Sequence, residues 1–165
     1  MQIHGLIHQF PKKIKITIFM FVLLLSIGFY GGLSFVNNTT SMQTAGVETN
    51  YLGNENDEDA EVMKFKKSER EILTIVHNHI LSMSVIFFLL ALILATTSIN
   101  KKLKYFLMIE PFVSVLLTFG GIYLLWSGVL WFKYIVMISG VFMTLSFVIA
   151  TFSIFYQLLF SKTNN

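Results

Sequence analysis

The sequence has no cysteine, only two prolines, and charged side chains at just 13% of its 165 residues. The lack of cysteine excludes disulfides, thiolate metal sites, iron–sulfur clusters and a cysteine nucleophile. Few charges combined with 55% apolar residues are not the composition of a soluble domain. The net charge of +3 is carried largely by lysines that flank apolar runs, so it leaves no basic surface for nucleic acid.

Four long apolar runs, at residues 16–36, 80–99, 105–126 and 134–160, make up more than half of the chain. A helix needs about 20 apolar residues to cross the roughly 30 Å of hydrocarbon in a membrane. The runs do not alternate between apolar and polar residues, as the strands of a membrane barrel would. The sequence therefore predicts an all-α membrane protein, a single domain (1–165) of four transmembrane helices packed as an antiparallel bundle.

The lysines predict the orientation of this bundle, because cytoplasmic loops of membrane proteins are enriched in Lys and Arg. The opposite side has Lys133 and a basic cluster, 64–70, inside an acid-rich loop, 37–71. We therefore expect both termini in the cytoplasm and the 37–71 loop on the outer side. The lysines that define the cytoplasmic side are Lys12, Lys13, Lys15, Lys101, Lys102, Lys104 and Lys162.

The first apolar run follows a basic head and so resembles a signal peptide. Its length of about 20 residues exceeds the 7–15 of a signal core, and we expect it to remain as an uncleaved helix. Gly28 and Gly32 are four residues apart, a spacing that lets another helix approach closely. We expect this face to pack within the bundle, with a homodimer contact as the alternative.

The outer loop contains an acidic run, 55–61, that does not have the glycine and glutamate spacing of a calcium-binding EF-hand. We interpret it as a solvated loop. Ser68 and Glu71 have the spacing of a capping box, which predicts that the second helix begins near Ser68. Residues 60–67 either form a separate turn on the membrane surface or lead directly into that helix.

His77 and His79 lie where this polar segment meets the second apolar run. Residues two apart on a helix point about 200° apart, so the two rings cannot share one metal ion unless the chain is extended there. His79 shares a helical face with Met83, and Met137 is expected at a similar depth on the fourth helix. These residues predict either a copper site or a b-type haem whose second axial ligand is Met137 or His79 of another copy. The alternative is that both histidines are ordinary interfacial side chains.

Other polar side chains are expected to have simpler roles. Glu110 is expected near the cytoplasmic edge of the third helix, where Lys101, Lys102 or Lys104 would pair with it. The alternative is that its carboxylate faces the bundle and relays protons or recognises a substrate. Pro111 predicts a kink or a late start of that helix. His4 and His8 are only two ligands, and two make a poor zinc site.

The segment Ser68–Met83 resembles a group of small bacterial four-helix inner-membrane proteins, and the likeness extends to Ile109–Phe112 and Leu117–Tyr123. That group has no characterised function, so the resemblance implies the architecture and draws attention to the His-x-His segment. The leading interpretation is a non-catalytic binding or accessory subunit that holds haem or copper at His79. The competing one is a structural partner of a larger membrane complex with no cofactor.

Overall fold

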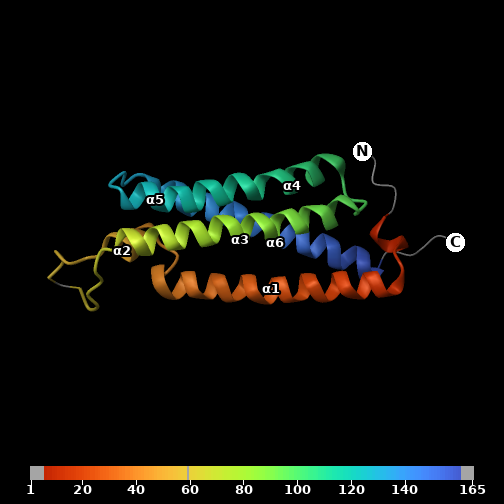
Figure 1. Cartoon of the computed structure of the whole chain (residues 1–165), viewed down its shortest axis with the longest axis horizontal. Coiled ribbons are helices and arrows are strands. Elements are labelled where there is room, and N and C mark those ends of the chain that lie inside the picture. The colour runs from red at the N-terminus through yellow and green to blue at the C-terminus, as the bar shows by residue number, and fades with distance from the viewer. Residues whose placement is uncertain (1–5, 59, 161–165) are drawn as a thin grey trace.

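The computed structural model describes residues 6–58 and 60–160, and in this part of the chain every regular element is a helix. Four long helices lie side by side and are long and apolar enough to cross a membrane (Figure 1). The predicted fold class is confirmed. The elements are η1 (Ile7–Gln9), α1 (Lys12–Thr40), α2 (Thr44–Leu52), α3 (Glu69–Ala95), α4 (Lys101–Val115), the π-helical turn η2 (Leu116–Gly120), α5 (Gly121–Trp126) and α6 (Phe132–Phe160).

The four spans alternate in direction. α4, η2 and α5 follow one another without a break and form the third span, Lys101–Trp126. The start of α1 and the end of α6 lie at one end of the bundle, whereas α2 and the segment that follows it lie at the other (Figure 1). We call this second end, residues 41–68, the outer cap, after the side that the lysines predict for it.

The capping box at the start of α3 forms as predicted. The Ser68 hydroxyl accepts a hydrogen bond from the Glu71 backbone N–H at 3.4 Å, and the Glu71 carboxylate accepts the Ser68 N–H at 2.8 Å. Two of the orphan N–H groups of the helix end are thereby satisfied. Residues 60–67 are not helical and lead directly into α3.

The third span begins earlier than its apolar run. Asn100 caps α4 by accepting hydrogen bonds from the backbone N–H groups of Lys102 and Leu103. The helix then continues through Pro111, which is buried, so the prediction of a late start was wrong. The irregularity comes instead at η2, one turn beyond the proline, where the helix widens into a π turn.

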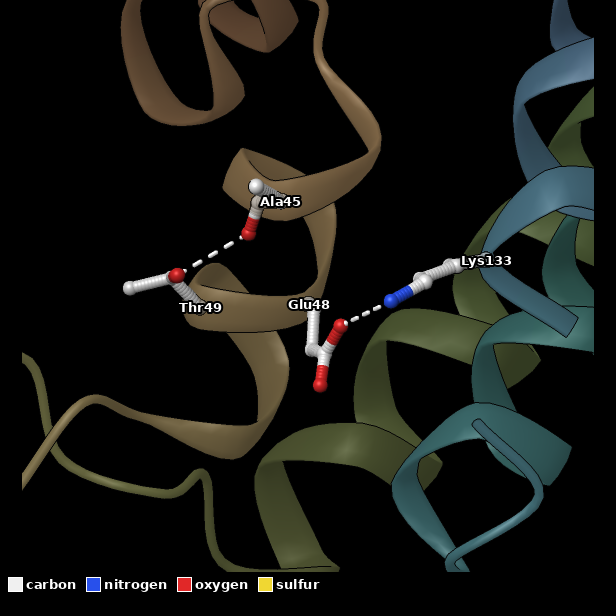
Figure 2. Close-up of polar contacts among 4 residues, drawn as sticks. All are labelled: Ala45, Glu48, Thr49 and Lys133. Atoms are coloured by element: carbon white, nitrogen blue, oxygen red, sulfur yellow. Dashed lines mark hydrogen bonds and ion pairs between the residues drawn. The ribbon is translucent and has the colours of Figure 1, made fainter. Parts of the chain in front are cut away.

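The outer cap contains a helix, α2, within the segment that was predicted to be a loop. α1 ends at Thr40, Ser41 and Met42 adopt left-handed backbone conformations, and α2 follows at once. Gly46 makes this sharp return possible, because a Cβ atom there would lie 1.9 Å from the Thr40 carbonyl oxygen. Figure 2 shows the ion pair that holds α2 to α6, with the Lys133 amine 2.6 Å from the Glu48 carboxylate.

α1 lies at the edge of the bundle, and very little of its apolar run is buried. One anchor is Phe29, whose ring stacks on Phe147 of α6 with 4.0 Å between centroids. Phe147 also meets Phe87 of α3 edge-on, so one side chain joins three spans. In the described part of the chain, no atom of another element lies within 4 Å of the Cβ positions of Gly28 or Gly32. The prediction that this glycine face packs within the bundle was therefore wrong.

Candidate functional site

The most polar contact inside the spans joins α4 to α6 through Glu110. The hydroxyl of Ser114, one turn further along α4, donates to one oxygen of the Glu110 carboxylate. The hydroxyl of Ser146, from α6, donates to the other. Both serines are almost fully buried, with 3% and 2% of their surface exposed, and Glu110 is half-buried. Each oxygen of the Glu110 carboxylate therefore accepts a hydrogen bond from its own serine hydroxyl.

The depth of this contact is set by Ser146, which lies fourteen residues from each end of α6. At 1.5 Å per residue, the serine is about 21 Å from either helix end. Glu110 thus lies level with the middle of α6, one of the two longest spans, rather than at the edge predicted for it. The predicted pairing with a lysine was also wrong, since Lys104 instead donates to the carbonyls of Ala95 and Thr97.

A second polar contact joins η2, the continuation of α4, to α6 two turns closer to the outer cap. The hydroxyls of Thr118 and Ser139 are 2.8 Å apart, and both residues are buried. Ser139 has a single hydroxyl hydrogen, which it donates to the Ile135 carbonyl at 2.7 Å. Thr118 is therefore the donor to Ser139. We call Glu110, Ser114, Thr118, Ser139 and Ser146 together the polar seam.

The π turn lies on the seam. Thr118 and Phe119 are both within η2 and both buried, although they are adjacent in sequence. Thr118 faces Ser139 of α6, while Phe119 stacks on His79 of α3 with ring centroids 4.6 Å apart. π turns inside α-helices occur frequently at functional sites. This one brings two neighbouring residues into contact with two different helices.

His79 is exposed on α3, and its Nδ1 atom lies 2.8 Å from the carbonyl oxygen of Ile75. A carbonyl oxygen only accepts, so Nδ1 carries the hydrogen. His77 is also exposed and lines a shallow groove on α3 with Glu69, Arg70, Leu73, Thr74 and Asn78. The helix is regular at both positions, which directs the two rings about 200° apart.

Met83 and Met137 are half-buried and pack against the apolar core. Met137 also lines a small apolar groove on α6 with Ile138, Val141 and Phe142. Within residues 6–58 and 60–160, no three His, Asp or Glu side chains gather in a way that would hold a metal ion. A site at His79 would therefore depend on methionine sulfur or on a second molecule of the protein.

Of the two N-terminal histidines, His8 lies in the described part of the chain and His4 lies outside it. His8 lies in η1, which docks on the bundle through a 2.9 Å hydrogen bond from the Ile7 N–H to the Thr96 carbonyl. The His8 Nδ1 atom is buried, and no partner for it occurs in the part of the chain that is described.

The outer cap is fixed to the bundle by polar contacts. Asn54 acts as a clamp: its backbone N–H donates to the Lys64 carbonyl, and its side-chain oxygen accepts the Lys64 N–H at 2.6 Å. The Lys64 amine turns inward and donates to the Thr39 carbonyl at 2.9 Å. The Trp126 indole donates to the Lys67 carbonyl at 2.8 Å, and the Lys66 amine lies 5.2 Å from the centre of the same indole.

Residues 41–165 match a sequence family named Aq_1264_TM and described as a transmembrane helical domain. The chain belongs to this family. The matched region contains α2 through α6, and hence the whole polar seam and the outer cap, whereas α1 precedes it. Neither the curated proteins nor the solved structures include a match to the chain. The Aq_1264_TM match agrees with an all-helical membrane domain and assigns no activity to it.

Proposed function

We propose that this protein is a non-catalytic accessory subunit of the bacterial inner membrane, whose outer cap binds a partner membrane protein. Both termini are placed in the cytoplasm on the basis of the lysines at that end of the spans. The observation that carries the proposal is the row of outward-facing apolar side chains on the cap. Phe65 is 70% exposed, and Val62 and Met63 are similarly open.

The cap segment has an inverted arrangement of side chains. Lys64, which would normally face water, is directed inward to the Thr39 carbonyl. Its neighbours Met63 and Phe65 are directed outward instead. The Asn54 clamp fixes this arrangement, with a further hydrogen bond from its side-chain amide to the Val62 carbonyl at 3.0 Å. Exposed apolar groups on a fixed segment are typical of interaction sites, where methionine and aromatic residues are enriched.

The partner contact is testable by placing a photoreactive amino acid at Met63 in cells. We expect one discrete cross-linked protein, and we expect Phe65→Ser to abolish it because the apolar contact is lost. The matched control places the same photoreactive group at Glu58, an exposed polar position on the same cap.

Each outcome of the cross-linking identifies what contacts the cap at Met63. A product of twice the subunit mass would identify a second copy of this chain as the partner. Cross-links to lipid alone, unchanged by Phe65→Ser, would show that the segment rests on the membrane surface, and the partner proposal would then be wrong.

The second candidate function is the binding of b-type haem or copper at His79. The observation in its favour is the hydrogen bond from Nδ1 to the Ile75 carbonyl, which leaves Nε2 free to bind a metal. Metal-binding histidines commonly use their other nitrogen in this way. Met83 or Met137 would supply the second ligand, or His79 of another copy would, and His77 would remain a weaker candidate on the opposite face.

An absorption spectrum and a metal analysis of the purified protein test this candidate. A haem site predicts a Soret band, and a copper site predicts about one copper per chain or per pair of chains. His79→Ala should abolish either signal, whereas the neighbouring exposed His77→Ala should leave it unchanged. A colourless, copper-free protein prepared with haem and copper supplied would exclude both.

A further inference from the structure

We propose that Glu110, Ser114 and Ser146 form a binding site for a sodium ion in the middle of the membrane-spanning bundle. The site is separate from the outer cap and from His79, so it does not depend on the functions proposed above.

The charge balance of the spans supports a cation at this position. Glu110 is the only acidic residue in the four apolar runs, and those runs contain no lysine or arginine. Its partners are two neutral hydroxyls, one from each of two helices. Charged side chains in the membrane interior are costly and are usually paired or functional. Among the described residues the carboxylate has two hydrogen-bond donors and no ion-pair partner.

The atoms around Glu110 suit a hard cation. Each serine uses its single hydrogen on the carboxylate, so its oxygen lone pairs remain available to accept a positive charge. The carboxylate oxygens also keep lone pairs beyond those used by the two hydroxyls. An all-oxygen set of this kind favours hard ions over copper or zinc.

The charge of the site favours a monovalent ion over a divalent one. A single carboxylate neutralises one positive charge, so a calcium or magnesium ion would leave a net charge within the hydrocarbon. The two hydroxyls hold one carboxylate oxygen each, so side chains of both helices orient the carboxylate. Sodium is the monovalent ion proposed, and the experiment below distinguishes it from a proton.

The polar seam extends from this site toward the outer cap. The Thr118–Ser139 pair lies two turns away along α6, within the same α4–α6 contact. The hydroxyls therefore place polar atoms between the carboxylate and the outer end of the bundle.

Binding of radioactive sodium to the full-length protein in detergent, measured by scintillation proximity, tests the proposal. We expect unlabelled sodium chloride, but not choline chloride, to displace the bound ion. Glu110→Gln should abolish binding, and Ser146→Ala should weaken it on the order of tenfold or more, since one ligand is lost. The control is Thr151→Val, which removes a buried hydroxyl of α6 that bonds only within its own helix.

Circular dichroism and gel filtration of each variant separate loss of binding from loss of fold. If Glu110→Gln does not fold, Ser114→Ala and Ser146→Ala still test the site, because both keep the carboxylate. Binding that is equal in wild type, Ser114→Ala and Ser146→Ala would overturn the proposal. So would a wild-type protein that binds no sodium while infrared spectra show Glu110 taking up a proton, since the site would then be a proton site.

Discussion

Replacing Phe147 by alanine should lower the free energy of unfolding by about 3–5 kcal/mol, the usual cost of removing a buried phenylalanine. Phe147 is 3% exposed and contacts Phe29 of α1 and Phe87 of α3. Its loss leaves a cavity where three spans meet. Because α1 has few other buried contacts, we expect it to separate from the other helices first. The measurement is the rate of proteolysis between α1 and α2 in detergent, which should rise.

The control for this experiment is Phe152→Ala on the same helix. Phe152 is 70% exposed and faces away from the bundle. Its truncation should leave both the unfolding free energy and the proteolysis rate close to those of the wild type. Equal effects of the two substitutions would show that α1 is not held by the Phe29–Phe147 stack.

The second large effect is expected from Gly46→Ala in the outer cap. The new Cβ would lie 1.9 Å from the Thr40 carbonyl oxygen, and this neighbour is backbone that cannot rotate away. α2 must then move relative to the end of α1, which weakens the Glu48–Lys133 ion pair shown in Figure 2. We expect a loss of about 1–3 kcal/mol, typical of overpacking, in denaturant unfolding of the purified protein.

Gly140→Ala is the matched control for Gly46→Ala. Gly140 lies within α6, and no atom of another element is within 4 Å of its Cβ position. Alanine favours the helix over glycine by up to about 1 kcal/mol, so this variant should be as stable as the wild type or more so. If Gly46→Ala has the same free energy of unfolding as Gly140→Ala, the turn between α1 and α2 has more space at Gly46 than the structure shows.

The apolar runs were sufficient to predict the four spans, because the length and composition of a membrane helix are set by the bilayer rather than by its neighbours. The start of α3 was also predictable, since the capping box is a local contact between Ser68 and Glu71. α2 was missed because it is short, contains Gly46 and has little periodicity. Its stability comes from tertiary contacts, including the burial of Tyr51, which raises the pKa of that phenol.

The polar seam was predictable only in part. Glu110, Ser114 and Thr118 are spaced by four residues and Ser139 and Ser146 by seven, so each set lies on one face of its helix. That these two faces meet depends on how α4 and α6 pack, which one sequence does not reveal. The depth of Glu110 was misjudged because α4 begins at Lys101, four residues before its apolar run, and because Ser146 reaches it from mid-span.

The Phe29–Phe147 stack also sets an order of events during synthesis. The two rings are 118 positions apart in the chain, 29 to 147, and one belongs to the first span while the other belongs to the last. At 5–20 residues per second, a ribosome needs roughly 6–24 s to make the intervening chain. During that interval α1 lies in the bilayer as a separate helix, which its apolar surface and complete backbone hydrogen bonding allow. Of the four long helices, α1 is therefore made before the other three and is among the last to be packed.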